Sequence, residues 1–507
     1  MKPALPLRPS RLQTLLLGSS RAQTLLLCVA LAACEPSAGD RASTEASAHA
    51  TPASAAAAPG SVGAATPTSL GHPANFEAKS VRIARGERLV HEFECARCHT
   101  GTGVEAPPLS KQCVGCHQAI LAGKYSIVDS ATGQRRSASK ADLREWQDHV
   151  VHLRHVPDLS QLGQTLREDW LARFLLNPED LRPALPASMP RFPLSPQQAA
   201  DIAAYLTRDA QPSAAQPSTA QPSAAQPSTA QRAPDQRSGS GQAPGLGVAA
   251  PVASIAGPDL LPGGEASVAE IDAGRRLFGS AGCAACHALT GAGTSPPNLP
   301  ADPRVLSPEA LLAPDLRHTR FRFRAVNFER WLAEPQQVRA SALMPNHRLG
   351  PGDRRKLQAF VWSAELQAAQ PAPVPTALPL LKREVKFDEV NREVFRKVCW
   401  HCHSQPDLAR GDGGPGMTGG FGFKGRKLDL SQYAGLLGGY LDDNGERRSL
   451  FTPAPSGEPV LLAVLKARQL EEAGQPTSVR GMPLGLPALS PQLIQLIASW
   501  IEQGRPH

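Results

Sequence analysis

The chain has 507 residues, 41% of them hydrophobic, with 49 prolines and 43 glycines, so it is long enough for several domains joined by linkers. It carries 53 lysines and arginines against 45 acidic residues, a formal charge of +8. Four of the basic residues lie in the first 33 positions, and no lysine and arginine cluster with interleaved aromatic residues occurs. Composition and charge therefore exclude nucleic acid as the expected partner.

Residues 1–33 have the composition of a signal peptide. Basic residues precede an apolar run at 25–33 that is too short to span a bilayer, and no acidic residue occurs before it. The run ends in Leu31-Ala32-Ala33-Cys34, which resembles the lipobox of bacterial lipoproteins. In that family the cysteine is acylated and becomes the mature N-terminus. The resemblance implies lipidation of Cys34, and ordinary cleavage at a small-residue site is the alternative.

Acyl chains on Cys34 would anchor the protein stably, and no later stretch is apolar enough for a transmembrane helix. We therefore expect a lipoprotein of the periplasm or cell envelope, attached to the inner or the outer membrane. Covalent attachment of haem in bacteria also takes place outside the cytoplasm.

Composition divides the rest of the chain into three segments. Residues 34–74 are mainly Ala, Ser, Thr, Pro and Gly, cannot bury a core, and are predicted to be a disordered tether. Residues 211–264 begin with a five-residue Gln-Pro-Ser repeat and form a linker, and residues 367–379 form a shorter proline-rich linker. Between them lie the first segment, 75–210, the second segment, 265–366, and the third segment, 380–507.

Each segment contains Cys-x-x-Cys-His, the attachment motif of c-type haem. Two thiols one helical turn apart can add to the two vinyl groups of one porphyrin, and the histidine that follows can bind its iron. The first segment has two copies and the others one each, so we expect four covalently bound haem c groups. The motif residues are Cys95, Cys98 and His99; Cys113, Cys116 and His117; Cys283, Cys286 and His287; and Cys399, Cys402 and His403.

The remaining cysteines, Cys28 and Cys34, lie at the N-terminus, so none is left for a structural disulfide. Four disulfides among the motif cysteines would suit a secreted protein but would not explain a histidine after every pair. A zinc ribbon needs paired Cys-x-x-Cys units at a fixed separation, and these separations are unequal.

One methionine in each segment precedes a proline shortly before the last predicted helix. These residues are Met189, Met344 and Met482. A thioether is a soft ligand that raises the reduction potential of a c-type haem, whereas an ordinary methionine fills gaps in a core. The recurrence in all three segments favours iron ligation. Met417 has no proline after it and is predicted to be a bystander.

A helix is predicted before the haem motif of each segment, and another after the Met-Pro pair. The first set is expected at residues 84–94, 268–280 and 388–397, and the second set at residues 196–206, 352–362 and 491–503. Asp353 and Ser490 are the expected N-caps of the last two helices.

With these features each segment resembles a class I cytochrome c domain. The stretch from Trp170 through Met189, and that from Trp331 through Met344, are similar to many bacterial cytochrome c domains, and the third segment looks like haem domains of large multihaem bacterial proteins. The resemblance implies a mainly α fold, with three small helical domains joined by disordered linkers. It also implies Met/His ligation of three haems, with methionine on the side of the iron opposite the motif histidine.

The first segment departs from this pattern because it has two haem motifs and one Met-Pro pair. Met189 is assigned to the haem at His99, which has the usual preceding helix. The haem at His117 then lacks an obvious distal ligand. The candidates for this distal ligand are a histidine cluster spaced i, i+3 and i+6, formed by His149, His152 and His155, and one further histidine, His91. The alternative is an exposed polar helix face. Surface positions, or positions beside a ligand, are expected for His401, His318 and His347.

Four redox centres and long spacers favour single-electron transfer between donor and acceptor proteins, with no catalytic residue in this chain. One alternative is a peroxidase-like enzyme that uses an open haem in the first segment. Another is the cytochrome subunit of a periplasmic dehydrogenase, in which a different chain performs the chemistry.

Overall fold

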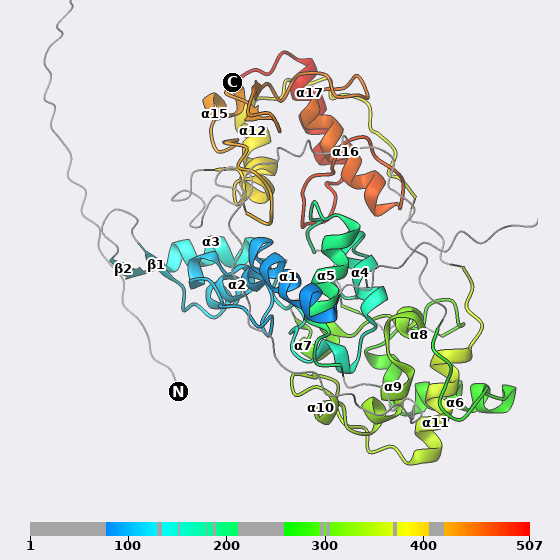
Figure 1. The fold of residues 1–507 in the computed structure, drawn as a ribbon. Coiled ribbons are helices and arrows are strands. Elements are labelled where there is room, and N and C mark those ends of the chain that lie inside the picture. The colour runs from blue at the N-terminus through cyan, green and yellow to red at the C-terminus, as the bar shows by residue number, and fades with distance from the viewer. Residues whose placement is uncertain are drawn as a thin grey trace, which may run out of the picture. The chain divides into compact units, whose positions relative to one another are not determined.

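The protein is mainly helical, as predicted, and two short hairpins supply the strands in the part of the chain that is described (Figure 1). A computed structural model describes residues 78–128, 134–150, 153–179, 181–185, 189–210, 258–294, 299–300, 305–368, 373–404 and 420–507. All of them belong to one unit, Ala74–His507. The predicted leader, the lipidation site Cys34, most of the linker 211–264, and Met417 lie outside the described residues.

In the first segment, α5 (Pro196–Leu206) packs against both α1 (Lys79–Glu92) and α4 (Glu168–Leu176). The first haem motif follows α1 in the 3₁₀ turn η1 (Cys95–Arg97), and the second motif begins helix α2 (Cys113–Leu121). The other elements are η2 (Leu109–Lys111), the antiparallel pair β1 (Ser126–Val128) and β2 (Arg135–Ser137), α3 (Lys140–His149) and η3 (Leu162–Gln164).

In the second segment, α6 (Val268–Ser280) packs against α11 (Pro351–Ser363), and the haem motif follows α6 in η4 (Cys283–Ala285). The elements between them are α7 (Pro308–Leu312), η6 (Leu316–His318), α8 (Thr319–Arg322), α9 (Ala325–Ala333) and α10 (Pro335–Val338).

In the third segment, α12 (Phe387–Val390) continues into the π-helix η7 (Asn391–Cys399), which ends at the first motif cysteine. The backbone N–H of Trp400 accordingly donates to the carbonyl of Phe395, five residues earlier, at 2.9 Å. The remaining elements are α15 (Tyr433–Leu437), the antiparallel pair β3 (Tyr440–Leu441) and β4 (Arg447–Arg448), α16 (Val460–Glu472) and α17 (Pro491–Glu502).

Helices α5 and α6 begin and end at the predicted residues, and a strong N-terminal cap fixes where each of them begins. The hydroxyls of Ser195 and Ser267 each accept a hydrogen bond from the backbone N–H three residues ahead. The side chains of Gln198 and Glu270 in turn accept from the backbone N–H of the capping serine, which completes a capping box at each helix.

Of the two predicted N-caps, one is confirmed and one is wrong. Ser490 caps α17 by accepting a hydrogen bond from the backbone N–H of Leu493. Helix α11 instead begins at Pro351, with Gly350 as its N-cap, because a proline is well suited to the first helical position. Asp353 lies inside the first turn, where its negative charge suits the positive end of the helix dipole.

A glycine on the first helix brings two helices into backbone contact in each of the first two segments. A Cβ added at Gly86 of α1 would lie 2.0 Å from the backbone oxygen of Asp201 on α5. A Cβ added at Gly274 of α6 would lie at the same 2.0 Å from the backbone oxygen of Lys356 on α11. Only glycine fits at such a distance. Each glycine precedes its motif by the same number of residues, so the crossing fixes where the motif begins.

Each segment has its own hydrophobic core, and the second motif of the first segment lies on a separate small cluster with Ile120 and Tyr125. The first and second segments also contact each other. Residues Leu166 and Phe323 form an isolated antiparallel bridge, and the backbone N–H of Arg324 donates to the carbonyl of Thr165 at 2.8 Å. The predicted domain boundaries and linkers stay predictions.

Candidate haem sites

The motif residues of the first, third and fourth Cys-x-x-Cys-His copies have the same local backbone geometry. The backbone N–H of the histidine donates to the carbonyl of the first cysteine at 2.9–3.0 Å, for His99, His287 and His403 alike. This single tight turn places both thiols and the imidazole on one side of the chain, as attachment to one porphyrin requires. In the second copy Cys113 starts helix α2, so the corresponding hydrogen bond from His117 to Cys113 is part of that helix.

Two of the motif histidines are held in the tautomer that can bind a metal. The Nδ1 of His99 lies 2.8 Å from the carbonyl oxygen of Pro157, and the Nδ1 of His287 lies 2.9 Å from that of Pro314. A carbonyl oxygen only accepts, so Nδ1 carries the hydrogen and the lone pair of Nε2 is left for iron. Burial lowers the pKa of both imidazoles, which keeps them neutral, as a metal ligand must be.

His403 is in a different environment. Its Nδ1 is buried and has no hydrogen-bond partner among the described residues, and burial alone lowers the pKa of its imidazole to about 4. A histidine that does not donate its second N–H is a less basic ligand. The three turns therefore share their backbone geometry but differ in how strongly the imidazole would donate to iron.

The surroundings of several motif cysteines disfavour the thiolate form. Burial raises the pKa of Cys95 and Cys399 to about 12 and that of Cys116 to about 11. None of the eight described cysteines forms a disulfide, and within the described ranges no group of three or more His, Cys, Asp or Glu side chains converges on a metal-ion site. Thioether bonds to a porphyrin leave uncharged sulfur, which suits such burial.

The three Met-Pro methionines lie beside the cores that also contact the first motif cysteine. Met189 and Cys95 pack against one core, Met344 and Cys283 against the second, and Met482 and Cys399 against the third. Each core therefore brings a thioether to the same apolar cluster as a porphyrin-binding thiol.

Neighbouring groups hold two of these methionines in place. The Trp331 indole N–H donates to the Met344 sulfur at 3.1 Å, and the Gln336 side chain donates to the Met344 carbonyl at 2.8 Å. The backbone N–H of Met482 donates to the carbonyl of Val464 on α16 at 2.8 Å.

A buried cluster of arginines lies between the sites at His99 and His287. Burial, together with Arg182 and Arg339, lowers the pKa of Arg322 to about 9. The Arg322 side chain keeps some exposed surface, but its Nε is buried without a hydrogen-bond partner among the described residues, as is the indole N–H of Trp170. Buried donors and excess positive charge call for an anionic group. The two carboxylates of a haem supply it, so this region fits the cofactor that the motifs imply.

The first two motifs lie next to each other. The hydrogen bond that the Cys98 thiol donates to the Cys113 side chain is the main cause that raises the pKa of Cys98, ahead of burial. One of the two sulfurs that would hold the haem at His99 is thus in direct contact with a sulfur that would hold the haem at His117.

The four histidines predicted as distal ligands for the haem at His117 are spread over the first segment. His91 lies exposed on α1, His149 ends α3, and His155 is half-buried, with burial and Arg154 lowering its pKa. His152 lies outside the described residues. The imidazole ring found against that of His117 is His401, which sequence reasoning assigned elsewhere. The sequence feature that could have pointed to His401 is its position between two haem-binding cysteines, Cys399 and Cys402.

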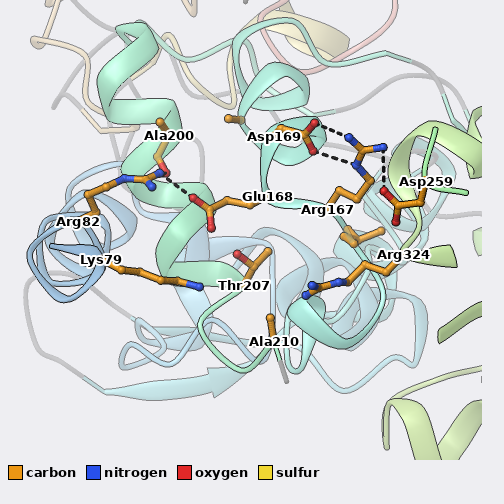
Figure 2. Close-up of a pocket in the computed structure, with 12 residues that line it drawn as sticks. Lys79, Arg82, Arg167, Glu168, Asp169, Ala200, Thr207, Ala210, Asp259 and Arg324 are labelled. Atoms are coloured by element: carbon orange, nitrogen blue, oxygen red, sulfur yellow. Dashed lines mark hydrogen bonds and ion pairs between the residues drawn. The ribbon is translucent and has the colours of Figure 1, made fainter. Parts of the chain in front are cut away.

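A solvent-open hollow on the first and second segments contains none of the haem-motif residues (Figure 2). Several of its charged side chains form ion pairs, while Lys79 and Arg324 line it as further cations. Arg82 and Glu168 are 2.7 Å apart, and Arg167 lies 2.7 Å from Asp169 and 3.4 Å from Asp259. Exposed ion pairs of this kind contribute little to stability.

Residues 271–365 match the family model described as Cytochrome c. The match begins within α6, spans the motif at Cys283, Cys286 and His287, includes Met344, and ends after α11. No curated protein and no solved structure matches the chain. In the ranges that the structure describes, no helix is both long and apolar enough to cross a bilayer.

Proposed function

We propose that this protein, whose residues 271–365 form a cytochrome c domain, is a tetrahaem c-type cytochrome that transfers single electrons at the cell envelope. A cytochrome c domain binds haem c covalently and acts in haem-based electron transfer. A hydrogen bond of the motif histidine that occurs in both segments extends this proposal from the second segment to the first. The hydrogen bond from His99 to Pro157 matches that from His287 to Pro314, inside the domain, to within 0.1 Å.

A bound haem supplies a one-electron Fe(III)/Fe(II) couple. The residues of this chain hold it and set its potential. The cysteine pairs fix the macrocycle, and the neutral histidine binds iron on one side. Met189, Met344 and Met482 are proposed to bind three irons on the other side and raise their potentials. The partly buried arginines Arg182 and Arg322 would neutralise the carboxylates of a bound haem and so favour the ferrous state of its iron.

The contacts between motifs support a relay rather than isolated carriers. The thiol contact between Cys98 and Cys113 joins the first two sites. The charge of Arg182 lowers the pKa of His99, and that of Arg322 lowers the pKa of His287. Because Arg182 also lowers the pKa of Arg322, these arginines link the first site to that of the second segment. Because electron tunnelling falls off steeply with the separation of macrocycle edges, neighbouring sites favour transfer within the chain. Redox proteins that deliver and accept the electrons are the proposed partners.

Protein matured in a host with c-type cytochrome biogenesis is expected to carry four covalent haems per chain, because each of the four motifs is complete. Intact-mass spectrometry of the mature chain measures the number of haem additions. Replacing both Cys113 and Cys116 by Ala should lower the count by one and leave the other three in place. Two or fewer haems on fully matured protein would contradict the tetrahaem proposal.

The anchor is a separate proposal, in which residues 1–33 are removed and Cys34 is acylated. Several acyl chains, each CH₂ contributing about 0.8 kcal/mol, hold a protein on a membrane. Cys34→Ser is therefore expected to move the protein from the membrane fraction to the soluble fraction after cell breakage and centrifugation. Cys28→Ser, a change in the same apolar run, is the matched control and should leave it bound. Unchanged membrane association of Cys34→Ser would show that no lipid on that residue is needed.

A further inference from the structure

The imidazole rings of His117 and His401 lie opposite each other although 284 positions of sequence separate them. Their centroids are 6.3 Å apart and their planes are inclined by 51°. His117 follows the second cysteine pair of the first segment. His401 lies between Cys399 and Cys402, inside the motif of the third segment.

This separation is the one expected for two imidazoles on opposite sides of a single iron. An imidazole nitrogen binds a first-row metal at about 2 Å and lies about 1 Å from the centre of its ring, so trans imidazoles have centroids about 6 Å apart. Ordinary tilted ring pairs cover the same range. The distance therefore becomes decisive only together with the chemistry of the two residues.

That chemistry singles out this pair. His117 is the only motif histidine in the described residues for which no Met-Pro methionine remains, because Met189 is assigned to the haem at His99. His401 occupies the third position of Cys-x-x-Cys-His. On a helical turn, residues i, i+3 and i+4 share one face, so the residue at i+2 points away from it. His401 is thus directed away from the haem of its own motif and is exposed on the third segment.

The third segment is held against the first by contacts beside the first haem motif. The backbone N–H of Phe421 donates to the Glu94 carboxylate at 3.1 Å, and the Arg97 guanidinium lies 5.0 Å from the centre of the Phe421 ring. A Cβ at Gly422 would lie 2.2 Å from the ring of Phe93, so a glycine is needed for this approach. Glu94 and Arg97 border and occupy the first haem motif.

A second set of contacts fixes the same two segments at another point. The carboxylate of Glu471 on α16 lies 3.7 Å from the Arg191 guanidinium, close to Met189-Pro190, and the Arg480 guanidinium donates to the Arg191 carbonyl oxygen. Two separate sets of contacts therefore position the third segment, and with it His401, independently of the chain that connects the segments.

We propose that His401 is the distal axial ligand of the haem attached to Cys113 and Cys116, trans to His117. The proposal rests on the proposed function, since it requires a haem at that motif. It makes this site bis-histidine, with a lower reduction potential than a Met/His site. A residue inside the attachment motif of the third-segment haem would then bind the iron of the haem at His117. The third segment thereby joins the relay through the haem at His117.

The test uses full-length protein with its haems attached, and compares His401→Ala with His155→Ala and His91→Ala. The His401→Ala variant repeats the residue found at that place in the second-segment motif, Ala285, so haem attachment is expected to be preserved. Intact mass gives the haem count, and electron paramagnetic resonance of the ferric protein gives the spin state.

We expect wild type and both controls to be low-spin throughout. His401→Ala should keep four haems and convert one of them, about a quarter of the haem, to a high-spin signal. Added imidazole should restore the low-spin state, and His401→Met should restore it with a raised potential at that haem. A fully low-spin His401→Ala variant with four haems would overturn the proposal, as would a high-spin haem in His155→Ala or His91→Ala. No haem on Cys113 and Cys116 in the wild type would instead defeat the tetrahaem function, an outcome that the mass alone reveals.

Discussion

Gly274→Ala is expected to destabilise the second segment by about 3 kcal/mol, even though alanine is the better helix former. The added methyl group would lie 2.0 Å from the backbone oxygen of Lys356 and 2.7 Å from the Cβ of Phe360, which is fully buried. Neither is the end of a flexible side chain, so helices α6 and α11 must separate. For a domain of about 100 residues, this loss lowers the melting temperature by about 12–24 °C. Calorimetry of the haem-loaded chain measures the shift.

Gly279→Ala provides the matched control, because Gly279 lies on the same helix and a Cβ there would have no atom within 4 Å. Replacing a helical glycine by alanine without a clash is expected to stabilise by about 0.5–1 kcal/mol. Gly86→Ala should behave like Gly274→Ala, since it clashes with Asp201 in the same way. Equal melting temperatures for Gly274→Ala and Gly279→Ala would show that the close helix crossing is not required for stability.

Local signals in the sequence were enough to predict two helices, α5 and α6, to the residue. Helices α5 and α6 begin at capping serines with a Gln or Glu three residues later, and such boundaries depend only on neighbouring residues. The cysteine pairs and following histidines are also local, so the motif residues could be read directly. Asp353 is not the N-cap of α11, because Pro351 already occupies the first helical position.

Features that depend on distant residues could not be read from the sequence. The role of Gly86 and Gly274 shows only when the partner helices are in place, because a glycine in a helix otherwise indicates a weak point. The π-helix before the third-segment motif has the apolar spacing of an ordinary helix. His401 faces His117 through packing between the first and third segments, and no spacing rule connects two residues so far apart.

Met344→Leu is expected to lower the reduction potential of the haem at His287 and to remove about a third of the ferric sulfur-to-iron charge-transfer absorption, if three haems are Met/His ligated. Leucine conserves volume, so the core of the second segment should lose less than about 1.5 kcal/mol. A change in potential and absorption without a large loss of stability therefore reports the loss of the thioether ligand and not the creation of a cavity. Trp331 would lose its acceptor, the Met344 sulfur, without any other change in packing.

The same substitution at the other methionines tests whether the three sites are equivalent and independent. Met189→Leu and Met482→Leu should each remove a similar share of the absorption and lower a different potential, because substitutions without shared partners are additive. Met417→Leu, the control, should change neither the spectrum nor the potentials. Spectroelectrochemical titration of the full-length protein records both quantities together. If Met344→Leu left the absorption and all four potentials unaltered, Met344 would be a core residue, and iron ligation by the Met-Pro methionines would have to be rejected at that site.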